Sequence, residues 1–371
     1  MINVVPIFFT KFPSFLRETW DELLAQSFPP TFQYEFEWVS AWTEFMRKDW
    51  KPFLLVVKED EKIIGIFPLM YRDEWRRNIL PFRRVKFLAS DQMDFSLVLA
   101  DQKNMFIVVD AALSWLYSGK LRWELLILDH LVEGNPAVSE IVNWLRAHNA
   151  ESEQHRGKYY YINLGRPWEE IWRDMSRRYV RRNINLARNR IYRAGSWQIE
   201  VNPDWDSSSI ISRASKIHMK RQEKFGRTSP YFDKNYKLFL GRIIDFAQTN
   251  QLFQSHWLKF RDQYIAYTFG FSQCGIYYGW QMAIDTDYES LYPMRLLLIE
   301  AIQLYYQKGF LEFNFGTGEA EYKTKWTNDS RGNYRFIVKN NNSTYGKLSH
   351  IYDKYFNLRR LLNKMGFSPM R

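Results

Sequence analysis

The chain has 371 residues, a formal net charge of +11 at pH 7 and an isoelectric point near 9.4. Its 46% hydrophobic and 18% aromatic content excludes an intrinsically disordered chain, and its length favours two domains. The excess of lysine and arginine favours an anionic partner such as a phosphate, an acidic glycan, nucleic acid or a membrane surface.

The expected location follows from cysteine usage and from the apolar segments. Cys274 is the single cysteine, so no disulfide can form within the chain and a reducing compartment is favoured. The apolar run at residues 1–12 has no basic region or cleavage site and is interpreted as a strand. The most apolar helical stretch, 294–306, carries Arg295 and Glu300 and is too short to cross a bilayer. We expect a cytoplasmic protein, with peripheral contact at the inner face of the membrane as an alternative.

The first half of the chain mixes strand and helix patterns. Residues 53–72 read as a hairpin of two apolar strands joined by an acidic turn. A turn and strand at 90–100, a helix at 110–117 and a buried strand at 123–131 follow. This order indicates a mixed α/β domain.

The second half repeats the same order more clearly. Three strands are expected within 251–284, then a helix that starts near Pro293 and ends near Gly309, then a strand at 310–316. The repeated order indicates two domains, 1–165 and 166–345. An apolar stripe with flanking lysines and arginines predicts a basic amphipathic helix in the tail, 346–371.

A basic helix is expected between the two halves, at 172–195. Apolar residues recur there at helical spacing, and the arginines fall on the opposite face, including Arg181 and Arg182. These arginines form a cationic ridge that is suited to phosphates, a glycan or tRNA. A solvated helix face is the alternative.

Three segments carry a family resemblance: "IHMKRQEKFG" (217–226), "YESLYPMRLLLIEAI" (288–302) and "FNFGTGEAEYKTKW" (313–326). With the order of elements, they make residues 170–330 resemble the GNAT acyltransferase superfamily, in the branch of CelD-like polysaccharide-associated acetyltransferases and FemAB-like transferases. The resemblance implies an α/β fold of two tandem GNAT-like domains, each a mixed sheet flanked by helices. The first domain would be the degenerate one.

The same resemblance assigns donor binding to the start of the helix near Pro293. In that family acyl-coenzyme A lies along the preceding strand, and its pyrophosphate meets the amino terminus of this helix. The positions that match are Tyr292, Pro293, Met294 and Arg295. Met294 departs from the family pattern, which has glycine there. An ordinary buried helix is the alternative.

The third segment is expected to carry the chemistry. By resemblance Tyr322 is the general acid that protonates the departing thiolate, and Glu319 or Glu321 takes the proton from the attacking group. Gly316 and Gly318 permit a tight backbone path. Two lysines, Lys323 and Lys325, are expected to hold a phosphate, a carboxylate or an oxyanion. The alternative is a turn with solvated charges.

Three further side chains are candidates outside that segment. His218 is a candidate base or acceptor-binding group, with a structural hydrogen bond as the alternative. Arg221 is expected to pair with an anionic acceptor, and Asp94 matches an acidic turn of the first domain that is structural or faces the acceptor.

The expected function is transfer of an acyl group from acyl-coenzyme A to an amine or hydroxyl of a sugar-containing acceptor in polysaccharide or cell-envelope biosynthesis. Acetyl is the favoured acyl group. No permanently bound cofactor and no metal site are expected. One alternative is a FemAB-like transferase that uses aminoacyl-tRNA. Another is a non-catalytic subunit of a polysaccharide-synthesis assembly.

Overall fold

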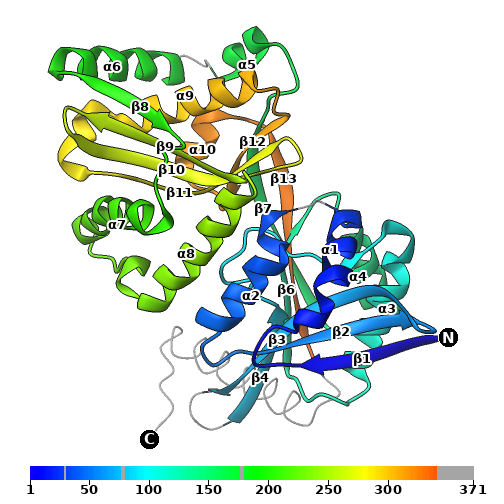
Figure 1. Cartoon of the computed structure of the whole chain (residues 1–371). Coiled ribbons are helices and arrows are strands. Elements are labelled where there is room, and N and C mark those ends of the chain that lie inside the picture. Colours follow the sequence, from blue (N-terminus) through cyan, green and yellow to red (C-terminus); the bar gives the residue numbers. More distant parts are fainter. Residues whose placement is uncertain (29–30, 77–79, 176–178, 341–371) are drawn as a thin grey trace, which may run out of the picture. The chain divides into compact units, whose positions relative to one another are not determined.

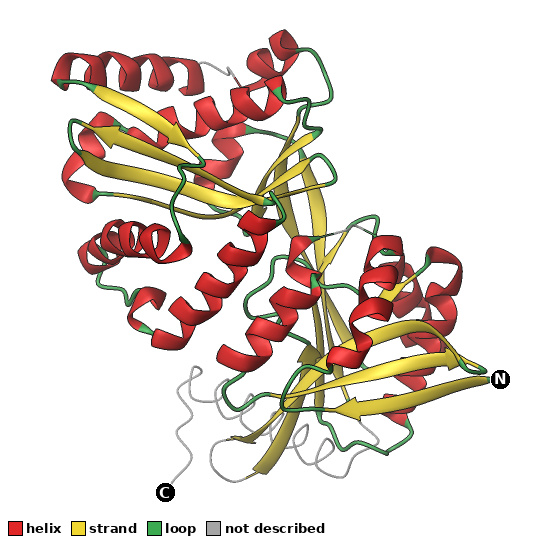
Figure 2. Ribbon diagram, in the orientation of Figure 1, coloured by secondary structure: helices red, strands yellow, loops and turns green. Residues whose placement is uncertain are grey.

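A computed structural model describes residues 1–28, 31–76, 80–175 and 179–340 (Figures 1 and 2). Its contacts divide the chain into two compact units, and each unit is built from separate stretches. Unit 1 contains 1–28, 49–156 and 334–340, and unit 2 contains 31–48 and 157–333. Unit 2 thus includes the early segment 31–48, and the expected domain boundary at 165 stays a prediction. The expected tail helix at 346–371 lies outside the described residues.

Unit 1 is a mixed sheet in which hairpin neighbours pair antiparallel and β4 pairs with β6 in parallel. The hairpin expected at 53–72 is confirmed, with Val57 opposite Gly65. A short strand, β5, pairs with β3. The strands are β1 (Ile2–Phe8), β2 (Lys51–Glu59), β3 (Lys62–Arg76), β4 (Leu80–Phe87), β5 (Leu99–Ala100) and β6 (Leu125–Val132).

Helices complete the core of unit 1. The apolar side chains of α3 (Met105–Tyr117) and α4 (Pro136–Ala147) share one buried cluster with alternate residues of β2, namely Phe53, Leu55 and Val57. Alternation along a strand sends these residues to one face. α1 (Arg17–Gln26) contacts β3 and β5. Unit 1 is therefore a mixed sheet flanked by helices, as expected.

Within unit 2 the strands of the sheet pair in the order β7-β12-β11-β10-β9-β8. The three strands expected within 251–284 are confirmed, as is the strand before Gly316. Neighbours pair antiparallel except β11 and β12, which are parallel. The strands are β7 (Ser152–Asn163), β8 (Trp197–Val201), β9 (Phe253–Phe260), β10 (Gln263–Gln273), β11 (Ile276–Ile284), β12 (Glu312–Thr317) and β13 (Ser330–Lys339), of which β7 and β13 each belong partly to both units.

Helices cover both faces of the β8–β11 part of this sheet. Figure 1 shows α6 (Tyr179–Ala194) and α9 (Pro293–Gln307) on one face, and α7 (Ser207–Lys224) and α8 (Lys234–Thr249) on the other. α2 (Phe36–Phe45) packs against α8, where the ring centroids of Trp38 and Phe239 are 5.3 Å apart.

The basic helix is confirmed in its described part. Successive turns of α6 bury Val180, Ile184, Ala187 and Ile191, while Arg181 and Arg182 are exposed. α5 (Trp168–Met175) precedes it. The arginines at 177 and 178 lie outside the described residues. The described part of the cationic ridge therefore begins at Arg181.

The parallel strands β11 and β12 separate after a short pairing. Their register runs only from Ile276↔Glu312 to Tyr278↔Asn314, whereas β11 continues to Ile284 beside β10. A register shift next to Gly270 leaves an extra residue in β11. The separation leaves room beside the second half of β11. Among the described residues, no helix is long and apolar enough to cross a membrane.

Candidate functional site

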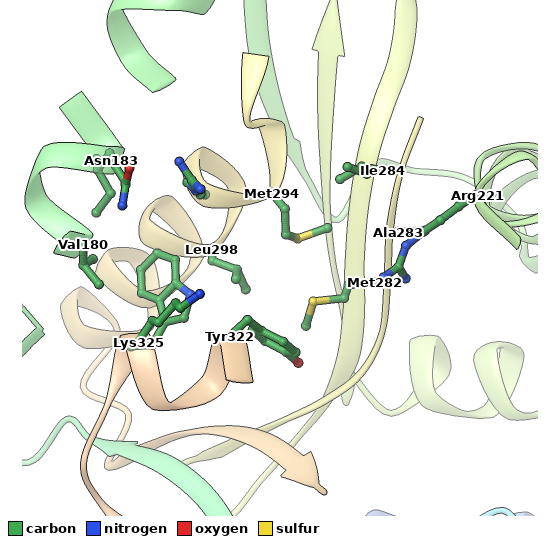
Figure 3. Close-up of a pocket in the computed structure, with 13 residues that line it drawn as sticks. Val180, Asn183, Arg221, Met282, Ala283, Ile284, Met294, Leu298, Tyr322 and Lys325 are labelled. Atoms are coloured by element: carbon green, nitrogen blue, oxygen red, sulfur yellow. The ribbon is translucent and has the colours of Figure 1, made fainter. Parts of the chain in front are cut away.

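A cavity of about 430 Å³ lies in unit 2, beside the part of β11 that β12 no longer pairs (Figure 3). Its walls come from β11, from the start of α6, from the last turn of α7, from the first turns of α9, and from the short helix α10 (Glu321–Trp326). These elements are far apart in sequence, and the strand separation brings them to one place. Its size is in the range of small-molecule and cofactor sites.

The walls are mostly apolar. Met282 of β11 and Met294 and Leu298 of α9 point into the same space, as Figure 3 shows, with Val180 of α6 at its side. Methionine side chains are flexible and adapt to irregular apolar ligands. Met282 and Leu298 could not be identified as site residues from the sequence, because apolar residues in a strand and a helix have the pattern of ordinary core.

Helix α10 brings Tyr322 to the cavity. No helix was predicted after β12, but residues 321–326 form one. Residues three and four apart share a helix face, so Tyr322, Lys325 and Trp326 all line the cavity. The ring of Tyr322 also contacts Phe315 edge-on, with centroids 6.4 Å apart.

Lys323 faces the other way and is not a cavity residue. It is buried, and its Nζ donates hydrogen bonds to the carbonyl oxygens of Gly316 (2.9 Å) and Thr317 (2.5 Å). The expectation that it would hold an anion is therefore corrected, since its ammonium is engaged by the turn between β12 and α10. Gly316 and Gly318 have φ of 73° and 94°, which supports the expected tight path.

A polar network supports the same turn from β12 and β13. Asn314 accepts a hydrogen bond from the Gly316 N–H (2.8 Å) and donates one to the buried Glu312 (2.8 Å). Arg331 binds Glu312 with both terminal nitrogens, at 2.9 and 2.5 Å, and its guanidinium lies 3.9 Å from the ring centroid of Tyr161. Bidentate pairs of this kind fix geometry.

The two candidate bases are not brought to the cavity. Glu319 and Glu321 are exposed, and neither lines it. Glu321 forms an ion pair with Lys325 (2.7 Å), and this hydrogen bond holds the pKa of the Glu321 carboxyl below its ordinary value. A carboxylate with a lowered pKa is a weaker base. No acidic residue is present among the described residues of the cavity wall.

The start of α9 has an unusual backbone. Tyr292 adopts a left-handed conformation with φ 54°, Pro293 is the first helical residue, and no side chain caps the helix. The guanidinium of Arg295 lies 4.0 Å from the centroid of the Tyr292 ring. Met294 and Arg295 line the cavity, whereas Tyr292 and Pro293 shape the backbone that presents them.

His218 and Arg221 lie one turn apart on α7 and have different surroundings. Nδ1 of His218 is 2.9 Å from Oγ of Ser229, and its Nε2 is 3.4 Å from the amide nitrogen of Gln222. Burial, followed by the charge of Arg221, lowers the pKa of His218. His218 does not line the cavity, and its ring makes the structural hydrogen bonds that were the alternative to a role as base or acceptor-binding group. Arg221 does line the cavity.

The remaining candidates lie elsewhere. Arg181 is exposed, with its guanidinium 5.9 Å from the Trp172 ring, and neither it nor Arg182 lines the cavity. Asp94 is half-buried in unit 1. Within the described ranges, no group of three or more His, Cys, Asp or Glu side chains is placed to hold a metal ion.

The comparisons with known proteins address the family. Residues 178–324 match the family described as "Acetyltransferase (GNAT) domain", so this part of the chain is a GNAT domain. It contains α6 to α9 and most of the cavity wall. No curated protein matches the sequence significantly.

Solved structures extend the likeness to most of the chain. FemX superimposes with a TM-score of 0.60 at 10% identity, over 88% of this chain and 96% of FemX. The C-terminal domain of a putative lysylphosphatidylglycerol synthetase from Agrobacterium fabrum has a TM-score of 0.53 at 11% identity, over 90% of this chain and 93% of that one. L-PGS from Bacillus licheniformis has 0.51 at 12% identity, over 88% and 93%.

Identities this low show the fold alone. They agree with the expected fold class of two tandem GNAT-like domains, each a mixed sheet flanked by helices, which is confirmed. The family match is limited to residues 178–324, and the fold of the chain is similar to that of FemX.

Proposed function

We propose that unit 2 is an acyltransferase in which Tyr322 protonates the leaving group. The observation that carries the proposal is the position of Tyr322 in a cavity that opens where β11 and β12 separate, within a GNAT domain. An amine or hydroxyl attacks the acyl carbonyl, the bond to the carrier breaks, and the phenol gives its proton to the departing sulfur or oxygen. Because no described acid lines the cavity, water takes the proton of the attacking group.

The first candidate donor is acyl-coenzyme A. The uncapped start of α9 presents backbone N–H groups and the positive end of the helix dipole, which bind phosphate. Arg295 adds a positive charge at the same place. Acetyl is the simplest acyl group for this donor.

A second candidate donor is aminoacyl-tRNA, and Met294 favours it. Its side chain projects from the start of α9 into the cavity, where a glycine would let a pyrophosphate approach the backbone. The name of the lysylphosphatidylglycerol synthetase describes joining a lysyl group to a lipid, which is aminoacyl transfer on the same fold. Arg181 and Arg182 would offer phosphate contacts to the tRNA.

The acceptor we propose is a sugar-containing amine or alcohol of the cell envelope, as in the CelD-like and FemAB-like proteins that the sequence resembles. Transfer to nitrogen or to oxygen is equally compatible with the cavity. A non-catalytic subunit with the same fold is the outcome that an absence of transfer would favour.

Thermal shift and single-turnover transfer test the proposal. Acetyl-coenzyme A, longer acyl-coenzyme A esters and aminoacyl-tRNA are each added to the full chain, and a ligand that binds the native state raises the melting temperature. The variant Met294→Gly should bind acyl-coenzyme A more tightly than the parent chain if that is the donor. Met282→Ala, on the facing strand, should not bind it more tightly. Transfer from none of the donors to a panel of amino sugars and lipid-linked sugars would contradict the proposal.

A further inference from the structure

The charges of the cavity wall are of one sign. Three cationic side chains line it, Arg221 from α7, Arg295 from α9 and Lys325 from α10, and no acidic side chain does among the described residues. Lys325 is neutralised by Glu321 on its exposed side. Arg221 and Arg295 have no ion pair with any described residue.

Several other arginines of unit 2 form ion pairs. Arg188 binds Glu300 (2.8 Å), Arg242 binds Glu44 (2.6 Å) and Arg331 binds Glu312. The acids that follow β11 are also engaged, because Asp285 and Asp287 bind Lys220 and Glu289 binds Lys224. Asp285, Asp287 and Glu289 are therefore held by lysines, and none of them forms an ion pair with the two arginines of the cavity.

Arg295 also has an unmet hydrogen bond. Its Nη1 is buried and has no hydrogen-bond partner among the described residues, although its guanidinium stacks on Tyr292. A buried N–H that lacks an acceptor is costly unless a ligand supplies one. A carbonyl or anionic oxygen can do so, whereas an ammonium group cannot.

Apart from Asn183, Tyr322 and Trp326, the other side chains of the wall are apolar. Met282, Met294 and Leu298 face the cavity together with Val180 and Ile184, and none of these side chains can solvate a charge (Figure 3). The volume of about 430 Å³ exceeds what an acetyl group needs, so a longer chain fits. A cationic end in this space would meet the guanidinium of Arg221, which has no ion pair with a described residue, and methionine side chains, beside the guanidinium of Arg295.

From these contacts we infer that the end of the acyl group that enters the cavity is uncharged and apolar, and that a cationic end, such as a lysyl side chain, is excluded. This inference rests on the proposed function and narrows its substrate class. It also separates this chain from a transferase of lysyl groups, despite the shared fold.

Matched donors that differ only in the terminal ammonium test the inference. For the ester carrier these are norleucyl-tRNA and lysyl-tRNA, and for the thioester carrier they are hexanoyl-coenzyme A and 6-aminohexanoyl-coenzyme A. The full chain should prefer the member without the terminal ammonium in the productive pair at least tenfold in kcat/KM. Met294→Glu places a carboxylate in the cavity, at a helix position that tolerates an acid. Relative to the isosteric Met294→Gln, it should lower this preference at least tenfold.

Equal or faster transfer of the cationic donor, or equal preferences for the Glu and Gln variants, would overturn the inference. Transfer from neither carrier would contradict the proposed function instead. In that case the carrier-free methyl esters of norleucine and lysine decide by thermal shift at millimolar concentration. The norleucine ester should give the larger shift, and any other order, including no shift from either, overturns the inference.

Discussion

The ammonium of Lys323, on α10, donates a 2.9 Å hydrogen bond to the carbonyl oxygen of Gly316, at the end of β12. This bond ties the first turn of α10 to the strand before it. Since Tyr322 is the preceding residue in that turn, the bond also sets where its phenol lies. The buried lysine thus has a positioning role, through the backbone, for the residue that we propose as the acid.

Replacing Lys323 by methionine should destabilise unit 2 by about 1–3 kcal/mol. The methionine fills similar space but leaves the buried carbonyls of Gly316 and Thr317 without their charged donor. Urea unfolding followed by tryptophan fluorescence measures the change. Lys325→Met on the same helix is the control, and it should cost less than about 1 kcal/mol because that lysine is half-exposed and paired at the surface. Equal costs would show that the carbonyl contacts of Lys323 contribute nothing.

Replacing Tyr322 by phenylalanine should slow transfer about a hundredfold to ten-thousandfold while donor binding is kept. The ring still fills the cavity wall, and only the proton that goes to the leaving group is lost. Single-turnover transfer and donor calorimetry provide the two readouts. Tyr192→Phe is the control, because Tyr192 is exposed on α6, and it should change neither the transfer rate nor donor binding. An unchanged rate when chemistry limits turnover would remove Tyr322 from the mechanism.

A buried histidine predicts how the stability of unit 2 depends on pH. His256 of β9 is fully buried against the rings of Tyr277 and Tyr305, and desolvation lowers its pKa from 6.5 to about 3. Between these values the unfolded chain binds a proton that the folded chain does not. The titration of His256 therefore costs no unfolding free energy above pH 6.5. Below pH 6.5 the unfolding free energy falls by about 1.4 kcal/mol per pH unit.

His256→Phe should remove this dependence. Neither ring nitrogen of His256 has a hydrogen-bond partner among the described residues, so phenylalanine keeps the packing without leaving a group unpaired. Between pH 6.5 and pH 5 the variant should lose about 2 kcal/mol less unfolding free energy than the parent chain. Urea titrations at the two pH values measure the difference. Parallel losses in both proteins would mean that His256 is hydrated or paired in solution.

Local patterns predicted the regular elements well. The hairpin at 53–72 and the three strands within 251–284 have strand-length apolar runs bounded by turn residues, and Pro293 marks the start of α9. Such signals depend on neighbours in sequence, and a single sequence displays them. The basic helix α6 was predicted for the same reason, since its stripe repeats every three or four residues.

The cavity could be predicted only in part. Tyr322, Arg221, Met294, Arg295 and Lys325 were candidates and do line it, but Lys323 has the same chemistry as Lys325 and faces the opposite way. The turn after Gly318 starts a helix, and that helix decides which lysine faces the cavity. The apolar wall and the packing of α2 on α8 arise from contacts between distant segments, which no local pattern reports.

The pairing of β10 with β11 requires a close backbone approach at Gly270, which predicts a strong effect of a single methyl group. A Cβ at Gly270 would lie 2.0 Å from the carbonyl oxygen of Tyr278 in β11, so the strand pair would have to move. Gly270→Ala should cost at least about 3 kcal/mol and should weaken donor binding, because Met282 lies further along the same strand. Gly241→Ala is the matched control, since a Cβ in α8 would have ordinary contacts from 3.6 Å, and alanine in a helix should stabilise by about 0.5–1 kcal/mol. In thermal melts, Gly270→Ala should therefore lower the melting temperature and Gly241→Ala should raise it. In donor calorimetry, only Gly270→Ala should weaken binding. A Gly270→Ala protein as stable as the parent would show that β10 and β11 tolerate a wider spacing at this bulge.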